Sequence, residues 1–406
     1  MTDLIREIAQ TLRRNKLRMA LTGFAVAWGI FMLIILLGLA NGLVNAFSEG
    51  MLGRDSNVLT VWGGQTTRPW KGLKDGRTIE LKDADMGAIE TDRDAPVALV
   101  TASLDNDSAI FAARNETITG GYSGVAPELT HYDDITVTAG RFINSRDMKL
   151  KRRSIVIKND EAQRIFGSDS AAVGQTMSAM GLTWTVVGVY DHRWRSGTYA
   201  PYTTAAALAG NAGDVGSLSV EIEGITTAEE GTAAEQSVRA ALARRHEFDP
   251  DDENAVWINN RFNNRLDSAK VMNLLVGAMW AIGILTLLSG IVGVSNIMFV
   301  SVRERTHEIG IRRALGARPR HILTQIVLES VAITTVAGYA GIVAGTAVTG
   351  LVGAATAEME MMKNPGIGLD TAVEVTAVLV VAGALAGLFP AVKATRVRPV
   401  EALRDE

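Results

Sequence analysis

The sequence predicts a membrane protein with four transmembrane α-helices and a large extracytoplasmic α+β domain inserted between the first and second helices. Two observations support this architecture: four long segments contain no charged residue, and basic residues gather on one side of those segments. The chain has 406 residues, a net charge of −4 and 47% hydrophobic side chains. This composition lies between that of a soluble protein and that of a chain built wholly of membrane spans.

The uncharged segments are residues 19–47, 271–302, 330–357 and 375–392. Each has about 18 residues or more, enough for a helix to cross a hydrocarbon core of roughly 30 Å. Helices buried in soluble proteins rarely stay uncharged over such a length. We therefore predict membrane spans at 19–42, 271–302, 321–357 and 371–392.

The first span is preceded by a basic leader, residues 1–18, in which Ile5, Ile8 and Leu12 recur at helical spacing. This spacing favours a cytoplasmic amphipathic helix that lies on membrane lipid, and a plain charged leader is the alternative. A cleaved signal peptide is less consistent with the sequence, because the apolar run far exceeds the usual core of about 7–15 residues. We expect a retained anchor.

The basic residues predict the orientation of the chain. They precede the first span, separate the second from the third and follow the fourth: Arg6, Arg13, Arg14, Lys16, Arg18, Arg303, Arg305, Arg312, Arg313, Arg318, Arg320, Lys393, Arg396, Arg398 and Arg404. The loop at 358–370 carries only Lys363. Because cytoplasmic loops are rich in Lys and Arg, we place both termini, the 303–320 segment and the 393–406 tail in the cytoplasm. The 43–270 segment and the 358–370 loop then lie outside.

The outer segment, 43–270, reads as one α+β domain, with two lobes as an alternative arrangement. Strand-like runs lie at 58–62, 97–100, 154–157 and 218–222, and helical patterns lie at 82–90, 160–166 and 228–245. Gly181 separates two strand-like runs and predicts a hairpin turn. Acidic residues outnumber basic ones in this segment, which argues against a nucleic-acid surface.

Motifs for catalysis and for metal binding are missing from the sequence. No G-x-x-x-x-G-K-[ST] loop occurs, so we expect ATP to be bound by a partner and not by this chain. His307-Glu308 begins like a zinc motif, but Ile311 stands where the second histidine belongs. We therefore predict no catalytic residue, no metal and no cofactor.

The charged 303–320 segment predicts a short cytoplasmic helix. Ile311, Ala314 and Leu315 form an apolar strip, Glu308 and Arg312 are spaced for an i, i+4 ion pair, and Gly316 is placed to stop the helix. Such a helix would offer an apolar ridge and arginines to a partner groove. The alternative is a basic loop that only fixes topology. The candidate contact residues are Arg303, Glu304, Arg305, Glu308, Ile309, Gly310, Ile311, Arg312, Arg313, Leu315 and Gly316.

Two polar residues within the spans are further candidates, because polar groups in a bilayer are costly and often functional. Asn296 lies in the second span and Glu329 near the cytoplasmic start of the third. We expect Glu329 to form a structural ion pair with a neighbouring basic residue, Arg320 or His321.

Several of these segments resemble one family. GIVGVSNIM at 290–298, SVRERTHEIGIRRALGA at 301–317 and PAVKATRVRPVEALR at 390–404 resemble FtsX/MacB-type ABC transporter permeases. Gly140-Arg141-Phe142 and the segments 154–167, 173–174 and 184–189 resemble that family's periplasmic core domain. The resemblance covers nearly the whole chain in the family's order.

The resemblance implies a multi-pass inner-membrane permease that dimerises with a second permease, either identical or different. It also implies that the 303–317 block couples the chain to a cytoplasmic ABC ATPase, whose nucleotide-driven movement reaches the periplasmic domain. Only 18 residues precede the first span, so we expect the ATPase on a separate chain. A periplasmic adaptor and an outer-membrane duct are further expected partners.

Several functions stay open at this point. Within the family, the alternatives to export are lipoprotein release and regulation of wall hydrolases. Outside it, the alternative is a membrane-anchored sensor or scaffold without an ATPase. The sequence does not identify the cargo.

Overall fold

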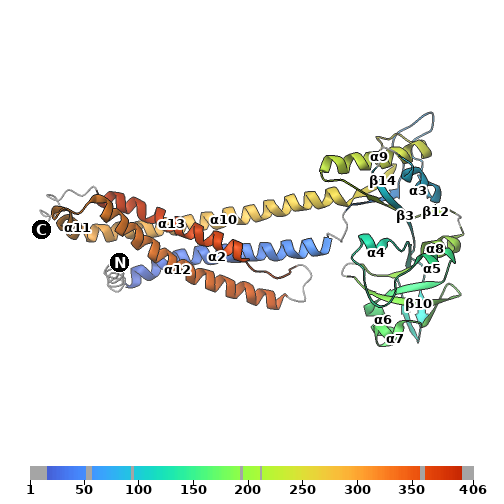
Figure 1. The fold of residues 1–406 in the computed structure, drawn as a ribbon, viewed down its shortest axis with the longest axis horizontal. Helices are drawn as coiled ribbons and strands as arrows, with labels where there is room; N and C mark the ends of the chain where they lie inside the picture. The colour runs from blue at the N-terminus through green and yellow to red at the C-terminus, as the bar shows by residue number, and fades with distance from the viewer. Residues whose placement is uncertain are drawn as a thin grey trace. The chain divides into compact units, whose positions relative to one another are not determined.

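The computed structural model describes residues 16–51, 57–92, 96–192, 195–210, 213–356 and 362–395. It divides the chain into two compact units (Figure 1). We call Met1–Ser48 with Lys270–Glu406 the helical unit, and Glu49–Ala269 the inserted domain. The amphipathic helix predicted within 1–18 and most of the 393–406 tail lie outside the described residues.

The helical unit contains the helices α2 (Lys16–Met51), α10 (Arg261–Glu304, which begins in the inserted domain), α11 (Thr306–Ala314), α12 (Pro319–Ala355) and α13 (Leu369–Thr395). In the described part of the chain, four helices are long and apolar enough to cross a membrane: α10, α12, α13 and the Gly23–Ala46 part of α2. The prediction of four apolar spans is therefore confirmed.

Close contacts between small residues hold α12 against α13. A Cβ atom at Gly383 would lie 2.1 Å from Oγ1 of Thr334, so only glycine fits there. The hydroxyl of Ser330 donates a hydrogen bond to the Gly383 carbonyl at 2.9 Å. Such backbone approach and hydroxyl bonding are typical of helices packed in membranes, where burial of apolar surface supplies little driving force.

The inserted domain is built around a 12-stranded sheet with the path β14-β1-β13-β3-β6-β11-β8-β10-β9-β4-β5, and β7 pairs with β10 beside this path. The first lobe contains the antiparallel strands β14 (Val256–Asn260), β1 (Val58–Gly63), β13 (Ser217–Ile222) and β3 (Val97–Asn106). Helices α3 (Asp83–Glu90) and α9 (Ala228–His246) and the short strands β2 (Leu81–Lys82) and β12 (Asp214–Val215) belong to the same lobe.

The second lobe contains the rest of the sheet: β4 (Phe111–Ala113), β5 (Glu116–Ile118), β6 (Tyr122–Val125), β7 (Thr136–Gly140), β8 (Ser154–Lys158), β9 (Thr176–Ala179), β10 (Leu182–Asp191) and β11 (Thr198–Pro201). Its helices are α4 (Leu129–Tyr132), α5 (Ser145–Lys149), α6 (Asn159–Phe166), α7 (Asp169–Ala172) and α8 (Tyr202–Ala209). Each lobe has a main hydrophobic cluster of its own. The lobes are also connected, because a further cluster joins Val58 of β1 to second-lobe residues and β3 pairs with β6 in one sheet. The domain is therefore α+β, as the sequence predicts.

The hairpin predicted at Gly181 is present. Leu182 pairs with Ala179 across the antiparallel strands β9 and β10. Met180 (φ 52°) and Gly181 (φ 70°) both have left-handed backbone conformations. Two successive left-handed residues match the right-handed twist of a hairpin, so the turn and the strands agree.

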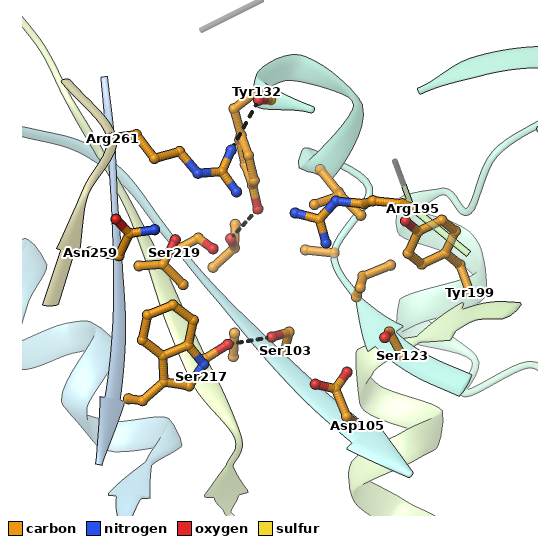
Figure 2. A pocket seen from close by; sticks show the side chains of 17 residues that line it. Ser103, Asp105, Ser123, Tyr132, Arg195, Tyr199, Ser217, Ser219, Asn259 and Arg261 are labelled. Carbon is orange, nitrogen blue, oxygen red and sulfur yellow. Dashed lines mark hydrogen bonds between the residues drawn. The ribbon is translucent and has the colours of Figure 1, made fainter. Parts of the chain in front are cut away.

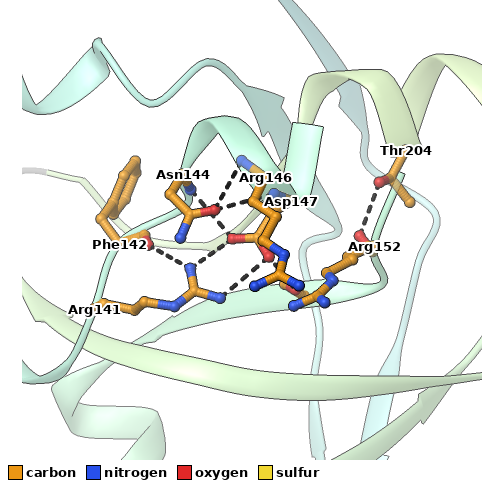
Figure 3. Close-up of polar contacts among 8 residues, drawn as sticks. Arg141, Phe142, Asn144, Arg146, Asp147, Arg152 and Thr204 are labelled. Atoms are coloured by element: carbon orange, nitrogen blue, oxygen red, sulfur yellow. Dashed lines mark hydrogen bonds and ion pairs between the residues drawn. The ribbon is translucent and has the colours of Figure 1, made fainter. Parts of the chain in front are cut away.

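A buried carboxylate fixes the connection between β7 and β8 (Figure 3). Asp147 accepts hydrogen bonds from both Nη atoms of Arg141 (2.5 and 3.1 Å), from the Asn144 backbone (3.2 Å) and from the Ser154 hydroxyl (3.3 Å). Burial acts to raise the pKa of Asp147, but these hydrogen bonds and the charge of Arg141 outweigh it and hold the pKa below its usual range. The Arg141 of the family-like Gly-Arg-Phe run therefore has a structural role.

Candidate functional site

The sharp turn between α10 and α12 forms the candidate site. Helix α10 ends at Glu304, Arg305 adopts a non-helical conformation (φ −102°, ψ 14°), and α11 follows. The Thr306 hydroxyl donates to the carbonyls of Val302 (3.2 Å) and Arg303 (2.8 Å). The Arg305 N–H also donates to the carbonyls of Ser301 and Val302, each at 3.2 Å. These bonds use carbonyls in the last turn of α10, where regular helical partners are missing.

The other end of α11 is closed by a glycine. Gly316 has φ +91°, its N–H donates to Arg313 O at 3.1 Å, and the N–H of Ala317 donates to Arg312 O at 2.9 Å. This pair of bonds around a left-handed residue is the Schellman cap. Pro319 then begins α12 at its first turn, where a missing N–H costs nothing. The stop predicted at Gly316 is present.

The predicted contact residues of α11 separate into an inner and an outer group. Ile309 and Gly310 are buried, and Ile309 joins the hydrophobic core of the helical unit. Ile311 and Leu315, one turn apart, are 40% and 83% exposed. The candidates that are also exposed are Arg303, Glu304, Glu308, Arg312 and Gly316, whereas Arg305 and Arg313 are half-buried. The outer surface therefore combines apolar and charged side chains.

Polar contacts fasten the segment to its neighbouring helices. Arg305 Nη1 lies 3.4 Å from Oε2 of Glu329 on α12, and this carboxylate is only 6% exposed. Arg313 Nη1 donates to the Thr395 carbonyl of α13 at 2.9 Å. A movement of α11 would therefore pull on two membrane helices.

Two expected pairings differ in the structure. Glu329 pairs with Arg305 and not with Arg320 or His321, because the bend after α10 returns Arg305 to the side of α12. The Glu308–Arg312 ion pair is not formed among the described residues: Arg312 Nη1 donates to Oε1 of Gln325 at 3.0 Å. An acceptor on the adjacent helix has replaced the local partner.

The second intramembrane candidate, Asn296, is exposed on α10. Its side chain makes no hydrogen bond with another described residue. An unsatisfied amide is costly in a bilayer, so Asn296 is a position where another chain could supply a partner. Its role stays a prediction.

Within the described residues, no group of three or more His, Asp or Glu side chains is arranged to bind a metal ion. The absence of a cofactor stays a prediction. The sequence analysis missed one polar surface, formed by hydroxyl side chains on β1, β3 and β13. Its signal is the alternation of hydroxyl and apolar residues along these strands, which becomes visible only when their register is known.

Four helices that are long and apolar enough to cross a membrane, together with a large inserted α+β domain, define the class as a multi-pass membrane protein. The family of the MacB-like periplasmic core domain matches residues 19–244, and the family of the FtsX-like permease C-terminal region matches residues 280–399. The chain belongs to the FtsX/MacB-type permease family.

Individual proteins agree with this assignment. The macrolide export ATP-binding/permease protein MacB 1/2 of Paracoccus denitrificans is 28% identical over 411 residues, which cover 100% of this chain and 59% of the relative. The probable syringafactin export ATP-binding/permease protein SyfD of Pseudomonas syringae is 28% identical over 96% of this chain and 57% of the relative. The chain thus spans about three fifths of the length of these relatives.

Among solved structures, the periplasmic region of MacB from Actinobacillus actinomycetemcomitans covers 54% of this chain and 94% of its own length. The identity is 20% and the TM-score is 0.43.

Proposed function

We propose that this chain is the transmembrane subunit of an ABC exporter, and that α11 is the surface that binds the cytoplasmic ATPase. One observation carries the proposal: Ile311 and Leu315 are exposed beside Arg312 on a helix whose opposite face is buried. An exposed apolar ridge on an amphipathic helix suits docking in an apolar groove of a partner, and arginine is enriched at such interfaces. A loop that only fixed topology would need the arginines but not the ridge.

The fastening of α11 supports a mechanical role. Arg305, which directly precedes α11, contacts α12, and Arg313 within α11 contacts α13. Force applied to the outer face would therefore pass into the spans. Helix α10 is a single helix from Arg261 to Glu304 and contains residues of both units. We infer that ATP-driven movement reaches the inserted domain through this helix.

The distribution of basic residues supports the orientation. Arg303, Arg312, Arg313 and Arg318 are clustered between the second and third spans, and an excess of Lys and Arg is typical of cytoplasmic loops. The proposal therefore places α11 in the cytoplasm, the inserted domain in the periplasm and the spans in the inner membrane.

The proposal includes a second permease subunit. The exposed amide of Asn296 would find its hydrogen-bonding partner on a facing helix of that subunit, as polar residues do between membrane helices. The relatives named as macrolide and syringafactin exporters favour export over lipoprotein release or regulation of wall hydrolases. An adaptor and an outer-membrane duct are proposed further partners, and the cargo is not assigned.

The test uses Leu315→Asp in the full chain. A charge on the exposed ridge should reduce retention of the ABC ATPase on the solubilised permease at least about tenfold, since loss of a hot spot costs more than ~1.4 kcal/mol. Folding should survive, because exposed substitutions usually change stability by no more than about 0.5 kcal/mol. ATPase retention is measured together with permease-stimulated ATP turnover.

The matched control is Leu150→Asp, which places the same charge at an exposed leucine of the inserted domain. It should leave retention unchanged. Normal retention and normal coupled turnover in both Ile311→Asp and Leu315→Asp would refute the interface. A permease that never retains an ATPase would instead support the sensor or scaffold alternative.

A further inference from the structure

The inserted domain contains a pocket of about 300 Å³ between its two lobes (Figure 2). One wall is the face of strands β14, β1, β13 and β3 that points away from α3 and α9. The other wall is supplied by β6, α4, β11 and Arg195. All of the lining residues belong to the inserted domain. The volume is at the lower end of the range of small-molecule sites, about 300–1,000 Å³.

The sheet wall of the pocket is polar. Leu59, Val61, Leu218 and Val220 on the opposite face belong to the core of the first lobe, whereas the residues between them carry hydroxyl groups. A sheet face whose only task was to pack against a second lobe would be apolar. Packing accounts for Val58, which joins an apolar cluster with second-lobe residues, and for Thr101, whose hydroxyl bonds to Tyr132. It does not account for the hydroxyl of Thr60.

The strand register aligns these polar residues in one row. Asn259 pairs with Thr60, Thr60 with Ser219, and Ser219 with Thr101. Four neighbouring strands thus each contribute one polar side chain, and all four line the pocket. A ligand with several hydroxyl groups could exchange hydrogen bonds along this row, because Ser, Thr and Asn both donate and accept.

One member of the row has an unmet hydrogen bond. Thr60 is 9% exposed, and its Oγ1 atom has no hydrogen-bond partner among the described residues. Buried hydroxyls are rarely left without a partner, because the desolvation cost is about 1–3 kcal/mol. By contrast, the hydroxyls of Thr101 and Tyr132 bond to each other at 2.9 Å.

Two arginines reach into the pocket from opposite walls, and Figure 2 shows their guanidinium groups extending toward one another. Asp133 lies beside both: its Oδ2 is 2.7 Å from Arg195 Nη2 and its Oδ1 is 3.0 Å from Arg261 Nη1. Arg261 Nη1 also donates to the Tyr132 carbonyl at 3.4 Å. Asp133 therefore pairs with both arginines, and a second carboxylate, Asp105, lines the pocket without an ion pair to either of them. Nε and Nη2 of Arg261 have no acceptor among the described residues.

We propose that this pocket binds a small hydroxylated oxyanion of the sugar-acid or sugar-phosphate class. Arg195 and Arg261 would bind the carboxylate or phosphate, for which guanidinium geometry is well suited. The row of Asn259, Thr60, Ser219 and Thr101 would bind ring hydroxyls. Trp62, which also lines the pocket and is partly exposed, would cover one face of the ring.

This inference goes beyond the proposed transport role and does not depend on it. Ligand binding here requires only the inserted domain, whereas ATPase retention requires α11. Either result can therefore fail without the other.

The experiment measures binding to the full chain in detergent by calorimetry. The probes are glucuronate, glucose 6-phosphate and glucose. We expect at least one of the two acids to bind, and glucose to bind at least about tenfold more weakly, because the charged hydrogen bonds to the arginines contribute much of the affinity. The acid that binds more tightly shows whether the pocket prefers a carboxylate or a phosphate. No binding of either acid at 10 mM, about the weakest affinity of interest, or equal binding of glucose, would overturn the proposal.

Matched variants locate the site. Thr60→Val removes a hydroxyl that has no protein partner. This variant should bind the acid about two- to tenfold more weakly, and its melting temperature should not fall. Thr198→Val is the control, because Oγ1 of Thr198 is also buried without a partner but does not line the pocket. The Thr198→Val variant should bind the acid with the same affinity as the unmodified chain.

Arg195→Gln is the second site variant, because Asp133 keeps its hydrogen bond from Arg261 and the fold should survive. The acid should bind at least about tenfold more weakly to this variant, and its advantage over glucose should shrink. Unchanged affinity in both Thr60→Val and Arg195→Gln would show that the ligand binds elsewhere and would refute the proposal.

Discussion

The helical unit and the inserted domain both have a hydrophobic core, but they differ in what else they bury and expose. In the helical unit, Leu274 and Val336 are exposed while Ser330 and Thr334 are buried. In the inserted domain, Trp184 and Phe111 are fully buried. The difference teaches that the units are stabilised by different forces: burial of apolar surface in the inserted domain, and close contact between small residues in the helical unit.

The largest effect should come from emptying the core of the inserted domain. Trp184 is fully buried and contacts Phe111 and Tyr122 edge-on or tilted. We expect Trp184→Ala to lower the free energy of unfolding of this domain by about 3–5 kcal/mol. Hydrogen exchange of the β8 and β10 peptides, read by mass spectrometry in the full chain, measures the change. Leu150→Ala, at an exposed leucine, should change exchange very little. Equal protection in both variants would contradict the account of this core.

A larger side chain between α12 and α13 tests whether close packing stabilises the helical unit. We expect Gly383→Leu to destabilise the unit by about 1–3 kcal/mol or more, because the new side chain would collide with Thr334 and push α13 from α12. The control is Gly350→Leu on α12, where no atom lies within 4 Å of an added Cβ. The melting temperature in detergent should fall for the first variant only. A similar melting temperature for both would mean that close packing of α12 and α13 is unimportant.

The smallest of the three effects concerns acid. The folded domain holds the pKa of Asp147 below its usual value, so its ionised form stabilises the fold above the unfolded pKa of about 3.9. This stability is lost as pH falls from about 5 through the lower, folded pKa. Burial also acts to raise the pKa values of Asp85 and Asp252, but hydrogen bonds outweigh it and both pKa values are lowered. The main hydrogen-bond partner is His246 for Asp85 and Thr67 for Asp252.

The test compares Asp147→Asn with the unmodified chain from pH 7 to pH 3 by hydrogen exchange. The variant should be less stable by roughly 1 kcal/mol at pH 7, and the difference should shrink toward pH 3. A difference that stays constant with pH would show that the charge of Asp147 does not contribute.

Local patterns predicted much of the architecture. Uncharged length alone located the four spans, and Gly316 predicted the end of α11, because helix stops act within one turn. The hairpin at Gly181 was predictable for the same reason. Each of these features depends on neighbours in the chain. The start of α11 at Thr306 was not predicted.

The missed features depend on neighbours in space. Arg305 is 24 residues from Glu329, and the bend that brings them together has no local signal for this pair. Arg312 likewise selects Gln325 on the next helix. The row that includes Thr60, Ser219 and Thr101 requires the pairing of strands far apart in the sequence, so the pocket could not be predicted without the sheet order.

The hairpin tip at Met180 and Gly181 also has a practical consequence for spectroscopy. The chain contains no cysteine, so Met180→Cys would carry the only thiol, at an exposed side chain whose backbone conformation a non-glycine residue already adopts. A second thiol at the exposed Leu369 would place a label on the helical unit. Spin labels at these two sites would report the distance between the units, and so would test the proposed movement, without any background thiol to remove.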